Sequence, residues 1–176
     1  YFGPAGQRVF STFHPSTDGR SRGLTIICPP LLSEYMRVHS ALRELAVSLT
    51  QRGHDVLRID YTGTGDSDGE LSAANLSDWT RDIALAVREG RNLSGSATVR
   101  LVGVRAGALL ACHAMGLSQN VNRFVLWDPI VSGAGYVDAL RRIQRTMLGR
   151  TLVSPADRAQ AVNEFAGYRL SGELLD

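Results

Sequence analysis

A five-residue segment with glycine at both ends, Gly103-Val104-Arg105-Ala106-Gly107, could place one side chain above a sheet. It follows an apolar segment at 98–102 that is typical of a buried strand, and it precedes a helix of small residues that ends near Gly116. Small residues at both ends of a strand-to-helix junction permit a very sharp turn. Such a turn lifts its central side chain and directs backbone N–H groups beside it. The segment therefore predicts a tight turn with Arg105 at its apex, where a Gly-x-Ser-x-Gly turn would carry a nucleophilic serine.

The chemistry of Arg105 is that of a cation and not of a nucleophile, because its guanidinium stays protonated near neutral pH. A fixed cation at a helix N-terminus combines its charge with backbone N–H groups and the helix dipole, and all three favour an anion. We hypothesise that Arg105 receives a carboxylate or a phosphate. The alternative is an internal salt bridge to one of four acidic residues, Glu34, Asp60, Asp66 or Asp128.

Several kinds of cofactor and partner are disfavoured by the sequence. All 19 basic residues are arginine, so a P-loop lysine, a Schiff-base lysine and a Ser–Lys dyad are excluded within this chain. The segment 60–67 contains Gly63 and Gly65 but lacks the third glycine of a dinucleotide fingerprint. The net charge is only +2, with scattered charges. We therefore expect no cofactor, no metal and no nucleic-acid partner.

The two cysteines and the hydropathy pattern bear on location. Cys28 and Cys112 lie in apolar stretches far apart in sequence, which predicts two buried free thiols and a reducing compartment. No apolar run approaches the ~20 residues of a membrane helix. We expect a cytoplasmic protein without a membrane span.

Apolar strands alternate with helices along most of the chain, which is typical of an α/β fold with a parallel sheet covered on both faces. Strands are predicted at 8–13, which would be antiparallel, and at 24–28, 56–60, 98–102 and 124–127, and helices at 35–52, 76–91 and 107–116. From Gly133 onward the pattern is helical and strandless, with Pro155 opening one helix. We expect a core over 1–132 and, in the same domain, a helical cap segment over 133–176.

Three segments together resemble the α/β-hydrolase superfamily in its serine-aminopeptidase-like branch: Cys28-Pro29-Pro30, the run Asp60-Tyr61-Thr62-Gly63-Thr64-Gly65-Asp66-Ser67, and the glycine-flanked turn. The Arg-bearing turn, the Pro-Pro loop and Leu126-Trp127-x-Pro129 are more narrowly similar to the hydrolases associated with the exosortase A system, second type. The resemblance covers residues 1–176 and implies a three-layer, mostly parallel sheet. Since members of the family continue further, it implies a sheet truncated at its C-terminal side and the beginning of a helical cap.

The resemblance also implies roles for individual positions. A serine at the turn attacks a carbonyl, a histidine takes its proton, an acid orients the histidine and two N–H groups hold the oxyanion. Arg105 occupies the place of the serine, and the expected histidine and acid would lie beyond this chain. Asp128 is a weak candidate for the acid, and pairing with an arginine is its other interpretation. Ala106 N–H and Leu31 N–H are the oxyanion-type donors, because Pro29 and Pro30 have none.

Three functions are compatible with these residues. The first is a non-catalytic or atypical relative that binds a small anionic or acyl ligand near Arg105, or a partner hydrolase. The second is an active ester, thioester or peptide hydrolase whose missing catalytic residues lie beyond residue 176, and the third is a fragment without activity. We also expect the strand at 124–127 to leave a hydrophobic sheet edge uncovered, which either further chain or a second copy in a homodimer would cover.

Overall fold

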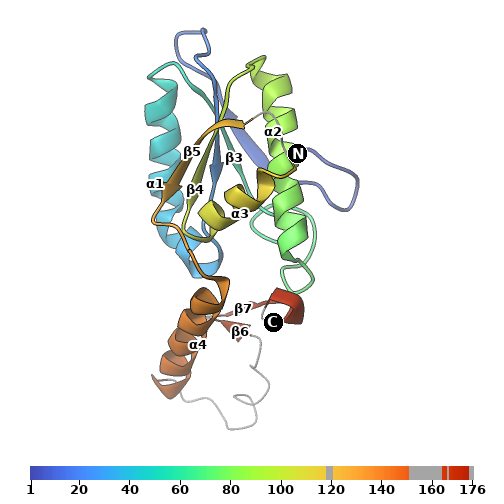
Figure 1. Cartoon of the computed structure of the whole chain (residues 1–176), viewed down its shortest axis with the longest axis vertical. Helices are drawn as coiled ribbons and strands as arrows, with labels where there is room; N and C mark the ends of the chain where they lie inside the picture. Colours follow the sequence, from blue (N-terminus) through green and yellow to red (C-terminus); the bar gives the residue numbers. More distant parts are fainter. Residues whose placement is uncertain (118–120, 151–163, 166, 175–176) are drawn as a thin grey trace.

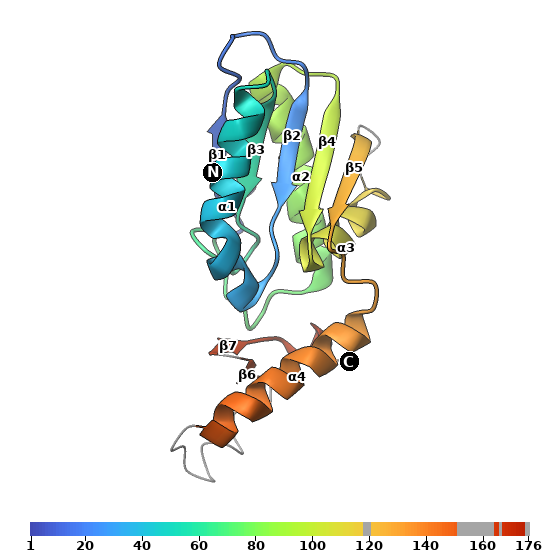
Figure 2. The same cartoon turned by 90° about the vertical axis from the view of Figure 1, so that its left-hand side faces the viewer.

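Five strands form one sheet in the computed structural model, which describes residues 1–117, 121–150, 164, 165 and 167–174. Their order across the sheet is β1-β3-β2-β4-β5 (Figure 2). Their bounds are Ser11–His14 for β1, Leu24–Cys28 for β2, Asp55–Ile59 for β3, Val99–Val104 for β4 and Val121–Trp127 for β5. Only β1 is antiparallel to its neighbour β3. The predicted mostly parallel sheet is therefore confirmed.

Helices cover both faces of this sheet (Figure 1). Helix α1, Leu32–Thr50, lies on one face, and α2, Leu76–Ser94, and α3, Ala106–Ala114, lie on the other. Side chains of a strand alternate between faces, so Ile27 of β2 packs in the cluster that holds Leu42 of α1. Its neighbour Ile26 packs in the cluster that holds Ile83 of α2. The predicted three-layer α/β architecture is confirmed.

The helix ends differ from the expected ones for local reasons. Helix α2 begins with a capping box, in which the Asn75 and Asp78 side chains each accept the other residue's backbone N–H. It ends at Gly95, whose φ of 65° is typical of a glycine C-cap, so it runs past the predicted end at Arg91. Helix α1 begins at Leu32, and Met36, which we expected on its buried stripe, is 71% exposed.

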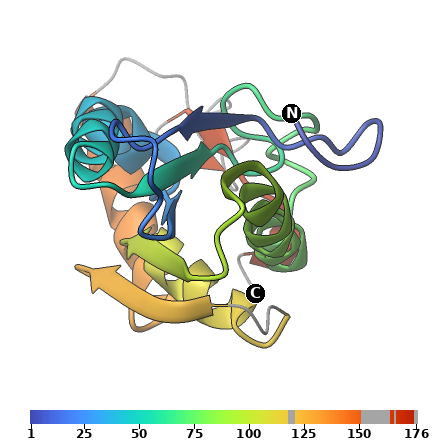
Figure 3. The ribbon, with the colours of Figure 1, turned by 90° about the horizontal axis from the view of Figure 1, so that it is seen from above.

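Strand β5 was expected to be buried, and this prediction is wrong. The side chains of its last three residues, Val125, Leu126 and Trp127, are about half exposed. Figure 3 shows β5 at the margin of the sheet, where β4 is its only neighbour among the described strands. A strand with one neighbour has an open edge, and the described helices leave the ends of the β5 side chains uncovered as well. The expectation of an uncovered hydrophobic edge is confirmed.

The two cysteines are free, as predicted, but only one of them is buried. Cys28 lies in the centre of the sheet, and its burial raises the pKa of its thiol to about 12. Cys112 is exposed, so its predicted burial is wrong. Helix α3 turns Ala108 and Ala111 toward the core, and Cys112 lies on the opposite, outward side.

The C-terminal part of the chain lies beyond the carboxyl ends of the parallel strands (Figure 2). Helix α4, Gly133–Arg150, is followed by a small antiparallel pair, β6 at Glu164–Phe165 and β7 at Tyr168–Arg169, and by a 3₁₀ turn at Gly172–Leu174. The expectation of a strandless tail is therefore wrong, because the chain reverses at Gly167, whose φ of 89° suits a glycine turn. Pro155 lies outside the described residues.

This C-terminal part packs onto the sheet domain. Leu140, Phe165 and Leu170 belong to the same buried cluster as the strands. The hydroxyl of Ser171 donates to the carbonyl oxygen of Ala74 at 2.9 Å. The division of the domain at residue 133 stays a prediction. Among the described helices, none combines the length and apolar character needed to cross a membrane.

Candidate ligand site at the turn between β4 and α3

The predicted tight turn joins the end of β4 to the start of α3. Arg105 is the single residue between these two elements, and its φ is 54° and its ψ −119°. This conformation costs a non-glycine residue roughly 1–3 kcal/mol. Two backbone hydrogen bonds hold it, from Arg105 N to Trp127 O at 3.0 Å and from Ile130 N to Arg105 O at 3.3 Å. The neighbouring strand and the segment after it therefore fix the strained residue in place.

The glycines on either side of Arg105 are required by close backbone approach. A Cβ at Gly103 would clash with the backbone of Ala108, and one at Gly107 would clash with the carbonyl oxygens of Cys28 and Pro29. The turn thus lies directly against the loop that follows β2. The sharp turn that the two glycines predicted is therefore confirmed, because only glycine allows the backbone to approach this closely.

The guanidinium of Arg105 is held by two carboxylates. Its Nε and Nη2 donate to Glu34 Oε1, both at 3.3 Å, and its Nη1 donates to Asp128 Oδ2 at 3.0 Å. Burial lowers the pKa of Arg105, but the Glu34 and Asp128 carboxylates outweigh it and the pKa lies above its ordinary value. One positive and two negative groups give the cluster a net charge of −1. Of the predicted ion-pair partners, Glu34 and Asp128 are therefore the ones that contact Arg105.

Asp60, another predicted partner, is engaged elsewhere. Its Oδ1 accepts the hydroxyl of Tyr35 at 2.6 Å, and its Oδ2 accepts the backbone N–H of Asp66 at 3.1 Å. The hydroxyl of Ser67 donates to the Asp60 carbonyl oxygen at 2.6 Å. The polar groups of the 60–67 segment thus hold that loop together.

Two polar atoms beside the Arg105 cluster are buried close to each other. They are Glu34 Oε2 in the first turn of α1 and the hydroxyl of Tyr136 in the first turn of α4. Burial, followed by the nearby Glu34 carboxylate, raises the pKa of the Tyr136 phenol. Sequence reasoning missed Tyr136, because a lone tyrosine in an amphipathic helix carries no motif.

An apolar cavity of about 210 Å³ lies between the turn and α4. Leu31 and Ala106, whose N–H groups the sequence singled out as donors, both line it. The other lining residues are almost all apolar and come from the four helices and from the segments that follow β5 and β7: Leu32, Leu76, Trp79, Leu109, Leu110, Ile130, Gly133, Tyr136, Val137, Leu140, Leu170 and Leu174. Leu31 and Ala106 thus meet at one small apolar cavity, next in sequence to the turn residue Arg105.

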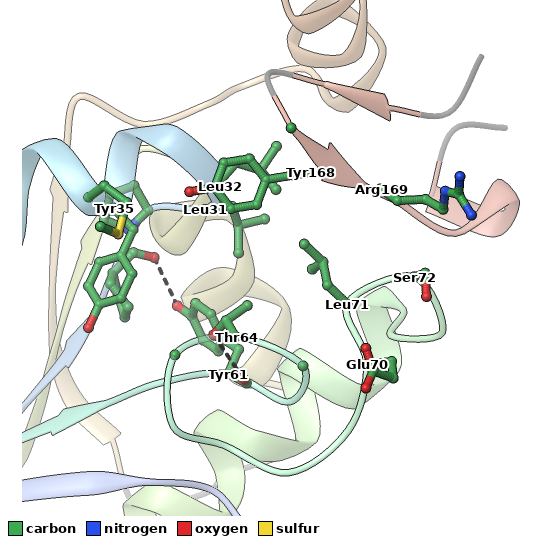
Figure 4. A pocket seen from close by; sticks show the side chains of 16 residues that line it. Leu31, Leu32, Tyr35, Tyr61, Thr64, Glu70, Leu71, Ser72, Tyr168 and Arg169 are labelled. Atoms are coloured by element: carbon green, nitrogen blue, oxygen red, sulfur yellow. Dashed lines mark hydrogen bonds between the residues drawn. The ribbon is translucent and has the colours of Figure 1, made fainter. Parts of the chain in front are cut away.

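A second cavity, of about 530 Å³, shares Leu31 and Leu32 with the first one (Figure 4). Tyr61 forms part of its wall, where its hydroxyl donates to Pro29 O at 3.1 Å (Figure 4). Tyr168 and Arg169 of β7 close another side. Sequence reasoning missed this cavity because it did not predict the β6–β7 pair. Leu31 and Leu32 therefore form a wall common to both cavities.

Comparison with known proteins gives a family and several relatives. A family model described as serine aminopeptidase, S33, matches residues 27–163, which is more than half of the chain. The palmitoyl-protein thioesterase ABHD10, mitochondrial, of Mus musculus is 33% identical over 100 residues, which are 54% of this chain and 30% of that protein. The Homo sapiens protein of the same name is 36% identical over 98 residues, 54% of this chain and 29% of that protein.

Solved structures agree on the fold. Est1E from Butyrivibrio proteoclasticus, solved with ferulic acid, has a TM-score of 0.66 and 18% identity, over 77% of this chain and 54% of that chain. Mouse alpha/beta hydrolase domain-containing protein 10 has a TM-score of 0.55 and 20% identity, over 95% of this chain and 63% of that chain. The aligned part is thus under two thirds of each relative's length. Taken with the match over residues 27–163, the sheet and its turn show that this chain belongs to the serine aminopeptidase, S33 family of α/β hydrolases.

Proposed function

We propose that this chain is a non-catalytic member of its family that binds an acyl ligand in the apolar cavity beside Arg105. The observation that carries the proposal is the position of this cavity. It begins at Ala106, directly after the residue that stands at the apex of the turn, and its walls are almost wholly apolar. Burial of an alkyl chain stabilises a complex by about 25 cal/mol per Å² removed from water. Such a cavity therefore favours a hydrocarbon group.

The lack of catalysis follows from Arg105 itself, if it occupies the place of the family's nucleophilic serine. A guanidinium whose pKa is raised further by Glu34 and Asp128 stays protonated and cannot attack a carbonyl. The same two carboxylates also neutralise it, so we favour an acyl ligand over an anionic one. The alternative is an active ester, thioester or peptide hydrolase whose missing catalytic residues lie beyond residue 176, and hydrolysis by a protein that extends past residue 176 would establish it.

The ligand's carbonyl has two candidate donors. Ala106 N–H belongs to the first turn of α3, where backbone N–H groups lack partners within the helix. Leu31 N–H follows two prolines and lies in the wall shared by both cavities. We propose that these N–H groups bind the carbonyl oxygen of the acyl group. The cavity is smaller than the roughly 300–1,000 Å³ of drug-sized ligand sites, which favours a short or medium chain.

The test is binding of p-nitrophenyl octanoate, followed by the fluorescence of Trp79, which lines the cavity. We expect a saturable change without release of nitrophenol above the uncatalysed rate. Val137→Phe narrows the cavity and should weaken binding about tenfold, whereas Val131→Phe, the same change at an 89% exposed position, should not. Release of nitrophenol, or no saturable binding, would contradict the proposal.

A narrower membership and a location form part of the proposal. The Arg-bearing turn and Leu126-Trp127-x-Pro129 support the group of hydrolases associated with the exosortase A system. The free thiols of Cys28 and Cys112 support a reducing compartment such as the cytoplasm. Measurement of the thiol redox state in cells would test the location, since a disulfide or other oxidised thiol would contradict it.

We also propose that the edge at β5 is covered either by further chain or, in a homodimer, by a second copy of this chain. The half-exposed side chains of Val125, Leu126 and Trp127 support this part, because monomers usually protect such an edge with charge or with a further element. Sedimentation of the chain should show concentration-dependent association, and Leu126→Lys should weaken it. A monomer at all concentrations would contradict self-association.

A further inference from the structure

We infer that a groove along α2 binds an acidic, amphipathic segment of a protein partner. The groove has a volume of about 840 Å³ and is lined by α2, by the loop that follows it and by the segment after α3. Both helices lie on the same face of the sheet (Figure 1). The groove shares no lining residue with the two cavities at the carboxyl ends of the strands, so it is separate from the proposed acyl site.

Three arginines line this groove, and they come from one side of α2. Arg88 lies seven residues after Arg81, and Arg91 lies three residues after Arg88. Residues at these spacings fall on the same side of an α-helix. No aspartate or glutamate is found among the lining residues that the structure describes. The groove therefore presents a positive surface, which attracts carboxylates or phosphates.

The three arginines differ in how far the protein itself already pairs them. Arg81 Nη1 lies 3.2 Å from Asp78 Oδ1, and Arg88 Nε donates to Glu89 Oε1 at 3.1 Å. The Arg88 side chain is nevertheless 64% exposed. The guanidinium of Arg91 has no hydrogen bond or ion pair within the described part of the chain. Arg88 and Arg91 therefore have donors to offer to an anion, whereas Arg81 is held by its own helix.

Apolar side chains lie between the arginines. Ala84 and Leu85 of α2 are half-buried, and Leu117, which lines the groove from the segment after α3, is 62% exposed. A small anion would leave these side chains uncovered. An amphipathic segment would cover them with its own apolar side chains and pair its carboxylates with Arg88 and Arg91.

A protein segment fits this groove better than a nucleic acid does. No aromatic residue on which a base could stack is among the described lining residues. Nucleic-acid affinity comes largely from many phosphate contacts, and here only Arg88 and Arg91 have donors to spare. Arginine beside apolar side chains is instead typical of protein interfaces.

The test uses a labelled synthetic peptide of about 14 residues, with leucine on one side of its helix and glutamate on the other, and follows its fluorescence anisotropy. Its helix would be ~21 Å long, enough to span the ~15 Å of α2 from Arg81 to Arg91. We expect saturable binding that weakens as salt is added, because salt screens exposed charges. The same peptide with glutamine in place of each glutamate should not bind.

Two pairs of substitutions decide whether the groove is the site. Arg88→Gln together with Arg91→Gln should weaken peptide binding about tenfold, since each exposed ion pair contributes a factor of about three. Arg37→Gln together with Arg43→Gln makes the same change in charge at exposed positions of α1 and should leave the affinity unchanged. Equal weakening by both pairs would indicate general attraction to a basic protein and would overturn the inference.

A second variant tests the apolar part and keeps the test valid if the arginine substitutions disturb the fold. Leu117→Ser should weaken peptide binding about threefold, because it removes apolar area that the peptide would bury. Leu93→Ser, at a 57% exposed position of α2 outside the groove, should not weaken it. The same loss from both serine variants would contradict the inference.

Two further results would also overturn the inference. One is the absence of saturable peptide binding. The other is single-stranded DNA of about 14 nucleotides that binds through Arg88 and Arg91 more tightly than the peptide does, which would assign the groove to nucleic acid. Neither result bears on the proposed acyl site, because p-nitrophenyl octanoate binding reports a cavity with different lining residues.

Discussion

Replacement of Arg105 by methionine separates a structural role of its guanidinium from a role in ligand binding. The Arg105 side chain is 34% exposed, Glu34 is 29% exposed and Asp128 is 71% exposed. The pair with the largely exposed Asp128 is worth about 0–1 kcal/mol, because solvent screens it. The two hydrogen bonds to the more buried Glu34 are worth about 1–2 kcal/mol after a similar discount. Arg105→Met should therefore destabilise the protein by about 1–3 kcal/mol.

Urea unfolding at pH 7 measures this loss directly. With a slope of about 1–3 kcal/mol per M, the midpoint should fall by about 1 M. Methionine keeps an unbranched apolar stem like that of arginine and bears the same backbone strain at φ 54°, so the change reports the loss of the guanidinium. Arg37→Met, at an exposed position of α1, is the matched control and should leave the midpoint unchanged.

Ligand affinity completes this test. p-Nitrophenyl octanoate should bind to Arg105→Met within a few-fold of its affinity for the unchanged protein, since the proposed donors to its carbonyl are the backbone N–H groups of Leu31 and Ala106. An Arg105→Met protein that is as stable as the original and has lost its ligand would refute the reasoning. That result would assign the guanidinium to the ligand instead of to Glu34 and Asp128.

Three further predictions concern the surrounding fold. Gly107→Ala should destabilise the protein by about 3 kcal/mol or prevent folding, whereas Gly133→Ala, which has open space around it, should be neutral in the same urea assay. Iodoacetamide at pH 8 should label Cys112 and not the buried Cys28 in the native protein, as intact mass would show, because the pKa of Cys28 is raised to about 12. Burial raises the pKa of Asp82 in the folded protein. Folding is therefore penalised while this carboxyl is ionised. The penalty disappears as the pH falls from the raised folded-state pKa toward the ordinary value of 3.8. Asp82→Asn should therefore lack this acid-induced gain in urea titrations between pH 7 and 4.

The sheet was predictable because its strands are short apolar runs between clear turn signals. Leu24–Cys28 is apolar throughout except for one threonine, and the structure buries all five residues between two helical layers. Val121–Trp127 has the same apolar character at its end, yet it lies at the edge. Hydropathy reports what a strand can bury but not whether a neighbour covers it, which depends on the order of strands in space. This is the physical reason for the error at β5.

The candidate site was predictable in part for a similar reason. The turn around Arg105 follows from local sterics, because Gly103 and Gly107 permit an approach that no side chain allows. The pairing of Arg105 with Glu34 joins residues that lie 71 positions apart, and the sequence offered four acidic residues with no means to choose. Tyr136 reaches the site only through the placement of α4, which local patterns do not specify. Long-range packing therefore supplied what the motif could not.

The strained backbone positions of the described chain all lie at the candidate site. Among the described residues, only Leu32, Arg105 and Asp128 are non-glycine residues with positive φ. Leu32 lines the apolar cavity, Arg105 forms the turn beside it, and Asp128 binds the Arg105 guanidinium. Strained residues persist where the surrounding structure over-determines them, and they gather at binding and catalytic sites. The strained residues here surround a cavity and a paired cation, which supports the proposal that this turn holds backbone donors and cavity walls in position for a ligand.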